Sequence, residues 1–275
     1  MRRAIADWDA AYANSAAVPG AEAIFAGWAA DSEAFRARAG GALDLAYGGH
    51  PRERFDFFAP AGAPAGLVVY FHGGYWRAFD KSGSSWLAAG PTARGWAMAV
   101  PSYPLCPEAR IADIARSAAR AVTAAAARAP GPITLAGHSA GGHLAARLVC
   151  ADGLLPEAAR ARVTRVVGIS GLYDLRPLMR TAMNETLRLD DAECAAQSPA
   201  LLAPASGIEA LAWVGAAELP EFRRQSRLLS NIWRGLGAST ECFEAPRRHH
   251  FDVIAPLAEA DSPLTDAVIG AHRGR

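Results

Sequence analysis

Residues 133–142 read Ile133-Thr134-Leu135-Ala136-Gly137-His138-Ser139-Ala140-Gly141-Gly142, an apolar run that leads into a serine flanked by glycines. A helical pattern follows and continues to Val149. G-x-S-x-G between a strand and a helix is typical of a nucleophile elbow, a turn so tight that only glycine fits two residues to either side of the serine. Such a turn presents the hydroxyl at the carboxyl edge of a sheet, beside the positive end of the helix dipole. The stretch therefore predicts a nucleophilic role for Ser139.

Strands and helices alternate from Glu53 onward, which predicts an α/β protein with a mostly parallel central sheet and helices on both faces, the α/β-hydrolase fold. The predicted strands lie at residues 54–58, 67–71, 96–100, 133–136, 166–170, 211–215 and 240–243, with a helix over about 108–128. We expect one domain over residues 1–275, with a helical N-terminal extension at about 1–40. The segment at about 175–204 interrupts the alternation, as either a small cap insertion over the site or an ordinary surface excursion.

Composition narrows the class of partner. The 275 residues carry a formal net charge of +1 at pH 7 and are 51% hydrophobic, which indicates neither a nucleic-acid partner nor a membrane partner. The four cysteines form no C-x-x-C pair, as is usual for reduced thiols, and the first residues lack the apolar core of a signal peptide. We therefore expect a cytoplasmic protein that acts on a small molecule without a cofactor. The sequence leaves the oligomeric state open, a homodimer included.

A serine nucleophile needs a base, and the base needs a carboxylate to orient it. In the predicted fold the chain order is serine, acid, histidine, so the base must follow Ser139. His249 and His250 both come directly after the last predicted strand, and from position alone either can be the base, whereas His272 lies in a charged tail. Glu218 follows the strand at 211–215, where the acid is expected. Asp174, after the preceding strand, is its main rival, and a helix-capping role explains Glu221.

Acyl transfer also needs hydrogen-bond donors for the oxyanion that develops in the transition state. His72-Gly73-Gly74 follows the strand at 67–71, so the backbone N–H groups of Gly73 and Gly74 are predicted donors, together with that of Ala140. Histidines cluster here, but no acidic or cysteine ligand stands at metal-site spacing near His72, His138 and His143. No metal is therefore predicted.

Several motifs together resemble the kynurenine formamidases, or arylformamidases, of the α/β-hydrolase type. These motifs are His72-Gly73-Gly74-Tyr75-Trp76, Gly137 to Leu144, Ser170-Gly171-Leu172-Tyr173-Asp174-Leu175-Arg176-Pro177-Leu178, Asn184-Glu185 and Glu218 to Ser226. The resemblance implies metal-independent removal of an N-formyl group from an aromatic amine, typically N-formyl-L-kynurenine. It also implies that the acid is Glu218 and that the base is His250, the histidine directly before Phe251. The family usually has aspartate where this chain has Glu218.

Three further residues are predicted to contact substrate. Tyr75 and Trp76 stand where the related hormone-sensitive-lipase-like esterases carry a third glycine, and their bulk is expected to narrow the acyl side of the pocket. Arg176, in the predicted cap with Arg180 and Arg188, is a candidate for binding a substrate carboxylate, because arginine pairs with carboxylates through two hydrogen bonds. The alternative function is a short-chain carboxylesterase, since ester and amide hydrolysis share a tetrahedral intermediate. A non-catalytic binding protein is disfavoured because every catalytic part is present.

Overall fold

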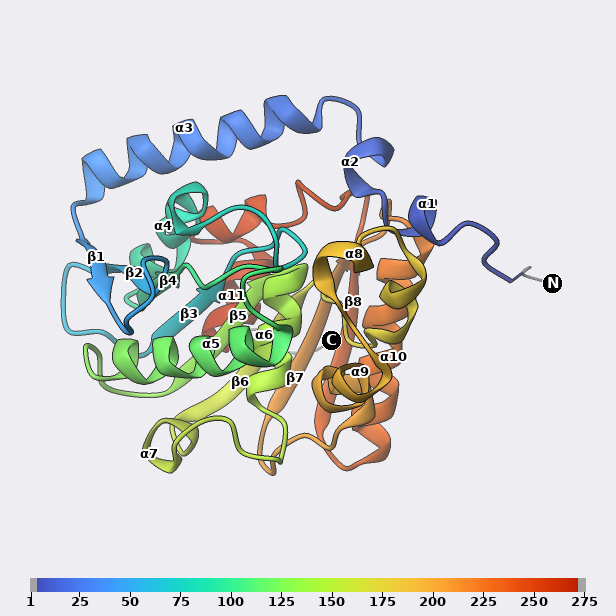
Figure 1. Ribbon diagram of the computed structural model, residues 1–275. Coiled ribbons are helices and arrows are strands. Elements are labelled where there is room, and N and C mark those ends of the chain that lie inside the picture. The colour runs from blue at the N-terminus through green and yellow to red at the C-terminus, as the bar shows by residue number, and fades with distance from the viewer. Residues whose placement is uncertain (1–3, 272–275) are drawn as a thin grey trace.

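A computed structural model describes residues 4–271, and His272 lies outside this range. Within it, eight strands form one sheet in the order β1-β2-β4-β3-β5-β6-β7-β8 (Figure 1). β1 pairs with β2 and β2 with β4 in antiparallel fashion, and the strands from β4 to β8 are parallel. The predicted α/β architecture with a mostly parallel sheet is therefore confirmed.

The strands are β1 Ala42–Ala46, β2 Arg54–Phe58, β3 Leu67–Phe71, β4 Ala97–Pro101, β5 Ile133–His138, β6 Val163–Ile169, β7 Glu209–Gly215 and β8 Ser239–Ala245. The α-helices are α1 Trp8–Tyr12, α2 Asn14–Ala17, α3 Ala21–Ala39, α4 Ala89–Ala93, α5 Ile111–Ala126, α6 Ala140–Leu148, α7 Glu157–Arg160, α8 Asn184–Leu187, α9 Asp191–Gln197, α10 Pro220–Gly235 and α11 Pro263–Ile269. Short 3-10 helices are η1 Lys81–Gly83, η2 Ser85–Ala88, η3 Arg176–Arg180, η4 Pro199–Leu201 and η5 Ala255–Ala258.

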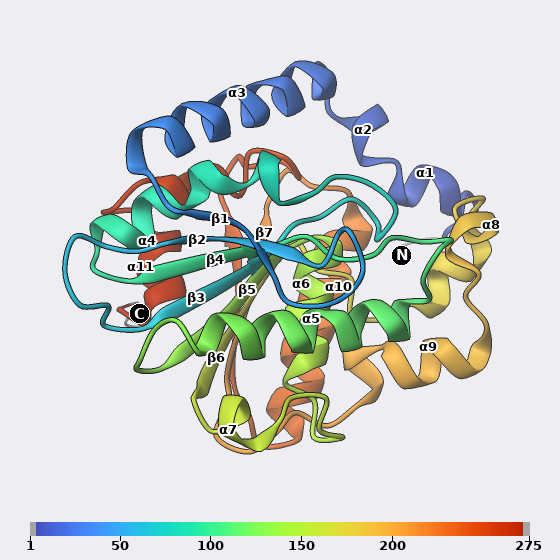
Figure 2. The same ribbon diagram turned by 60° about the vertical axis from the view of Figure 1, so that its left-hand side comes forward.

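The central strands are apolar throughout because both of their faces are covered. In β3, Leu67, Val69 and Phe71 point into one core, and Val68 and Tyr70 point into the other. Helices α5, α6 and α10 pack on the first face, and α4 and α11 on the second. Figure 2 shows α3 and α4 above the sheet and α5 below it. This sandwich holds the carboxyl ends of β3, β5, β6 and β7 at one edge, where parallel α/β sheets place their sites.

Seven strands lie where the sequence predicts them, with ends that differ by up to three residues. β1 is the strand that the sequence analysis missed. Its sequence, ALDLA, is composed mainly of good helix formers and contains a left-handed residue, Asp44, with φ of 55°. Pairing with β2 across an irregular register sets its conformation, so tertiary context overrides the local preference.

The N-terminal segment lies over the carboxyl edge of the sheet. Helix α1 packs against α10 and η3 and lies beside α8 in Figures 1 and 2, and α2 leads to α3, which continues across the sheet. The predicted cap segment at 175–204 contains η3, α8, α9 and η4, and it packs against α1, α5, α6 and α10. Among residues 4–271, no helix is long and apolar enough to cross a membrane.

Candidate active site

The elbow at Ser139 is strained in the way that its glycines predict. Ser139 has φ of 54° and ψ of −116°, a conformation that L-residues rarely adopt. A Cβ on Gly137 would lie 2.3 Å from the carbonyl oxygen of Gly141, and one on Gly141 would lie 2.0 Å from that of Phe71. Side chains at either position would therefore force the turn open. The Ser139 N–H donates to the Ile169 carbonyl at 2.8 Å, which ties the elbow to the end of β6.

His250 and Glu218 form a buried hydrogen-bonded pair. The Nδ1 atom of His250 lies 2.6 Å from Oε2 of Glu218, whose side chain has no exposed surface. The other carboxylate oxygen, Oε1, accepts from the backbone N–H of Gly215 at 2.7 Å and from the hydroxyl of Ser170 at 2.5 Å. These two donors hold the carboxylate in one orientation. Because an ionised carboxylate only accepts, Nδ1 of His250 carries the proton and Nε2 is free to accept one.

The geometry separates His250 from its neighbour. His250 lines the cavity that also contains Ser139. The centroid of the Phe222 ring lies 4.4 Å from that of the His250 ring. The His249 ring instead accepts hydrogen bonds from the backbone N–H groups of Phe251 and Asp252, and it does not line that cavity.

Asp174, the rival acid, is engaged by the guanidinium of Arg176 through two hydrogen bonds of 2.9 Å. The structure therefore brings Glu218, not Asp174, to the histidine in the cavity.

The predicted oxyanion donors flank the elbow. A Cβ on Gly73 would lie 3.2 Å from Cβ of Ser139, so the Gly73 backbone approaches the serine directly. The N–H groups of Gly73 and Gly74 have no acceptor within residues 4–271, and Ala140 begins α6, where no intrahelical partner exists for its N–H. Gly74 has φ of 103°, and a Cβ there would lie 2.3 Å from the carbonyl oxygen of Ala78. Unpaired N–H groups beside the hydroxyl are what a developing oxyanion requires.

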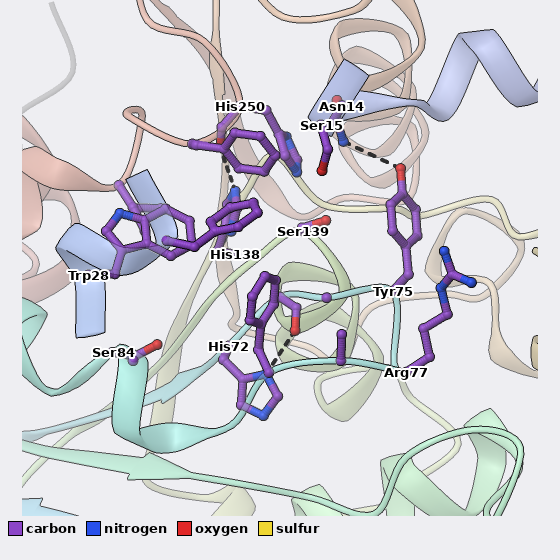
Figure 3. A pocket seen from close by; sticks show the side chains of 18 of the residues that line it. Asn14, Ser15, Trp28, His72, Tyr75, Arg77, Ser84, His138, Ser139 and His250 are labelled. Carbon is purple, nitrogen blue, oxygen red and sulfur yellow. Dashed lines mark hydrogen bonds between the residues drawn. The ribbon is translucent and has the colours of Figure 1, made fainter. Parts of the chain in front are cut away.

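A cavity of about 650 Å³ opens above Ser139. Figure 3 shows the serine hydroxyl turned toward the space between His250 and Tyr75, with Trp28 farther along the wall. The aromatic part of this wall contains Phe25, Trp28, Phe79 and Phe251, and the Phe25 ring packs 4.8 Å from Phe251 and 5.1 Å from Phe79. The site thus has one wall suited to a planar, apolar group.

Much of the cover over this cavity comes from the N-terminal segment. Nine cavity-lining residues precede β1, namely Asp9, Tyr12, Ala13, Asn14, Ser15, Ala16, Phe25, Trp28 and Ala29. Within the predicted cap at 175–204, Met183 is the only described residue that lines the cavity. The cap was predicted from a break in the strand–helix alternation, which locates an insertion but not the surface that the insertion covers. The sequence analysis left open whether this insertion covers the site, and the structure places most of the cavity cover in the N-terminal segment.

Tyr12 anchors the N-terminal segment to helix α10. Its hydroxyl donates to the carboxylate of Glu221 at 2.9 Å and accepts from Nε2 of Gln225 at 3.3 Å. Glu221 also accepts two hydrogen bonds of 2.8 Å from Arg224. Burial, and then the charge of Glu221, raise the pKa of Tyr12 well above its usual value. Glu221, which the sequence analysis explained as a helix-capping residue, therefore binds the N-terminal segment as well.

Two of the three predicted substrate contacts are not at the cavity. Trp76 is fully buried in the core and lies edge-on to the His143 ring at 4.9 Å. Arg176 does not line the cavity and is ion-paired with Asp174, which lies two residues earlier in the chain. Tyr75 does line the cavity, and its hydroxyl donates to the carbonyl of Tyr12 at 2.7 Å. The structure therefore places Tyr75 at the cavity, and Trp76 and Arg176 away from it.

The histidines around the elbow are buried and neutral. Burial lowers the pKa of His72 to about 4 and that of His143 to about 3. Burial, and then the neighbouring His250, also lower the pKa of His138, whose Nε2 donates to the His250 carbonyl at 2.8 Å. His138 thus holds the backbone of His250. Within residues 4–271, no three histidine, cysteine, aspartate or glutamate side chains are grouped as metal ligands would be.

The sequence analysis missed several residues of the site. Ser170 orients Glu218, and its signal was its place at the end of a predicted strand, beside Ser139 in the sheet. Tyr12, Asn14, Phe25 and Trp28 line the cavity from a segment with no motif. Their only sequence signal was the presence of several aromatic residues in an alanine-rich stretch, which does not indicate what they cover.

Comparison with known proteins agrees with this geometry. The profile of the α/β hydrolase fold matches residues 68–242. The kynurenine formamidase of Salmo salar is 28% identical over 240 residues, covering 82% of this chain and 80% of its own, and that of Danio rerio is 26% identical over 236 residues with the same coverage. These relatives confirm the resemblance to kynurenine formamidases that the motifs predicted.

Solved structures give the same fold. The crystal structure of a candidate thioesterase from Silicibacter sp. TM1040 superposes with a TM-score of 0.92 at 46% identity, covering 96% of this chain and 99% of that one. The esterase LipW of Mycobacterium marinum superposes with a TM-score of 0.68 at 22% identity, covering 91% of this chain and 86% of that one, and supports the fold alone. The elbow, the sheet and the matched profile agree, so the chain belongs to the α/β hydrolase fold family and is a hydrolase.

Proposed function

We propose that this enzyme removes the N-formyl group from an aromatic amine, most specifically from N-formyl-L-kynurenine, with Ser139 as nucleophile, His250 as base and Glu218 as the orienting acid. The observation that carries the proposal is the 2.6 Å contact between Nδ1 of His250 and Glu218, made at the wall of the cavity that contains Ser139. That contact leaves Nε2 of His250 as the only ring atom able to take a proton from a hydroxyl in the cavity.

The chemistry follows from these positions. Nε2 of His250 accepts the Ser139 proton while Oγ bonds to the formyl carbon, and the carbonyl electrons move to its oxygen. The N–H groups of Gly73, Gly74 and Ala140 stabilise that oxyanion. When the oxyanion collapses, the C–N bond breaks and His250 returns the proton to the aryl amine. Water, activated by the same histidine, then releases formate and restores Ser139.

The aromatic wall favours an aryl substrate. Phe25, Trp28 and Phe79 present ring faces and edges to the cavity, and planar rings pack well against such surfaces. The kynurenine formamidases that match most of this chain are named for an aryl formamide of this kind. A small-molecule substrate also fits the cavity volume of about 650 Å³.

A carboxylesterase or thioesterase activity uses the same machinery and is the alternative. The candidate thioesterase that is 46% identical to this chain is the observation in its favour. An acyl group larger than formyl would have to fit beside Tyr75, whose ring is held by hydrogen bonds to Tyr12 and Asn14. We expect this fixed ring to favour formyl over longer acyl groups.

The test compares kcat/KM on three substrates: N-formyl-L-kynurenine, p-nitrophenyl acetate and acetyl-coenzyme A. The proposal expects the formamide to be preferred by at least about a hundredfold, with activity lost in Ser139→Ala. A higher kcat/KM on either acetyl compound would assign the enzyme to that class instead. Formamide hydrolysis that persists in Ser139→Ala would refute the serine mechanism.

A further inference from the structure

Arg77 is the only lysine or arginine among the described residues that line the cavity. It follows the oxyanion turn, four residues after Gly73. Figure 3 shows its side chain beside Tyr75, on the side of that ring away from Ser139 in this view. An exposed positive charge therefore lines a cavity whose wall is otherwise largely apolar.

The guanidinium of Arg77 is unpaired in this structure. Within residues 4–271 it makes no hydrogen bond, ion pair or ring contact, although its backbone N–H donates to the Gly74 carbonyl at 3.0 Å. Two of the three arginines of the predicted cap differ, because Arg176 is paired with Asp174 and Arg180 lies 5.0 Å over the Trp8 ring; Arg188 does not line the cavity. Arg77 thus keeps all its side-chain donors for a ligand.

The backbone around Arg77 is held rigidly. Tyr75 and Trp76 have φ values of 50° and 54°, which L-residues adopt only when their surroundings fix them. Trp76 is fully buried, and its carbonyl accepts from the Cys106 N–H at 2.8 Å. The turn therefore fixes the distance between the Arg77 Cα and the oxyanion donors. The Arg77 side chain, exposed and without a partner among residues 4–271, can adjust to a ligand within the reach that this backbone sets.

The charges at the cavity also constrain the ligand. Asp9 and Asp80 line the same cavity; Asp9 accepts from the Ala182 N–H at 2.7 Å, and Asp80 accepts from the Ser82 N–H at 2.7 Å. These carboxylates would repel a ligand that carried only negative charge. A zwitterion brings a carboxylate for Arg77 and an ammonium group that Asp9 or Asp80 attracts.

We propose that Arg77 forms a carboxylate subsite, through which the enzyme recognises the α-amino acid end of a zwitterionic substrate while the formamide lies at Ser139. Arginine suits this role because its planar fork donates two parallel hydrogen bonds to a carboxylate. The inference rests on the proposed formamidase function. It adds recognition of the substrate's α-amino acid end, which the catalytic residues around Ser139 do not provide.

The test uses three formamides: N-formyl-L-kynurenine, the corresponding amine that lacks only the carboxylate, and formanilide. In Arg77→Gln, KM for N-formyl-L-kynurenine should rise about tenfold with little change in kcat, as the loss of one charged pair predicts. KM for the other two substrates should stay within about twofold, and Arg77→Lys should recover part of the loss. The matched control is Arg247→Gln, which removes an exposed charge near His250 but outside the cavity.

An equal effect of Arg77→Gln on all three substrates, or none on any, would overturn the subsite. If the wild-type enzyme hydrolysed no formamide, the proposed function would fail instead. Calorimetry with Ser139→Ala protein separates the two failures, because it compares binding of L-kynurenine with binding of its decarboxylated amine and needs no turnover. The subsite requires about tenfold tighter binding of the amino acid, and that preference must disappear when Arg77→Gln is added.

Discussion

Glu218→Gln changes one atom in a position where the surroundings decide how the new side chain lies. The carboxylate oxygen Oε1 accepts from the Gly215 N–H at 2.7 Å and from the Ser170 hydroxyl at 2.5 Å. In the variant the amide oxygen must take that place, since an NH₂ group there would face the Gly215 donor. The amide nitrogen is then directed at Nδ1 of His250, 2.6 Å from the present Oε2.

An NH₂ group can only donate to Nδ1, so that atom must be unprotonated. The imidazole proton then lies on Nε2, the nitrogen that should accept from Ser139. The variant therefore holds the base in the wrong tautomer and also removes the charge that stabilises the imidazolium. We expect kcat to fall by about 10⁴, or about 5 kcal/mol of transition-state stabilisation.

The assay is steady-state hydrolysis of N-formyl-L-kynurenine, with thermal denaturation to confirm that each variant is folded. The matched control is Glu221→Gln, the same change at a second buried glutamate, whose carboxylate binds Tyr12 and Arg224 rather than His250. This control should lose about 1–3 kcal/mol of unfolding free energy but keep kcat within about threefold. A Glu218→Gln variant within tenfold of wild type would refute the reasoning, as would a larger loss of kcat in Asp174→Asn.

Three further predictions test the site and its cover. His250→Ala should abolish turnover by about 10⁴-fold, whereas His249→Ala should stay within about tenfold of wild type, and the opposite ranking in kcat would move the base to His249. Gly73→Ala places a Cβ 3.2 Å from that of Ser139, so kcat should fall by about 10²–10³ while the protein stays folded; unchanged kcat would exclude this turn as the oxyanion site. Tyr12→Phe removes a hydrogen bond to a buried carboxylate and should lower Tm by about 3–6 °C, and an unaltered Tm would show that this anchor contributes nothing.

The parts of the site that follow strand ends were predictable from the sequence. Ser139, Ser170 and Glu218 each come directly after or just beyond an apolar strand, and parallel strands deliver their carboxyl ends to one edge. The choice between His249 and His250 was not predictable from position, because both follow β8. The resemblance favoured His250, and the structure shows why the two differ: His249 is occupied by backbone N–H groups of its own loop.

The expectations for Trp76 and Arg176 have one feature in common, which is that side-chain direction was inferred from position in the chain. Trp76 adjoins Tyr75, yet the indole is buried in the core while the phenol lines the cavity. Arg176 lies in a segment predicted to cover the site, yet a carboxylate two residues earlier holds it elsewhere. Arg77, which does reach the cavity, had no motif to distinguish it.

The sequence by itself determined the elbow, the parallel sheet and the family, because each depends on interactions within a few residues or within one strand–helix unit. Glycines at 137 and 141 are required by contacts inside the turn and with the adjacent strand. Only the tertiary structure decided what covers the cavity and which cation lines it. Tyr12 meets Glu221 across 209 residues of chain, and no local pattern encodes that contact. It forms because burying aromatic surface over the open edge of the sheet is favourable only once the sheet exists.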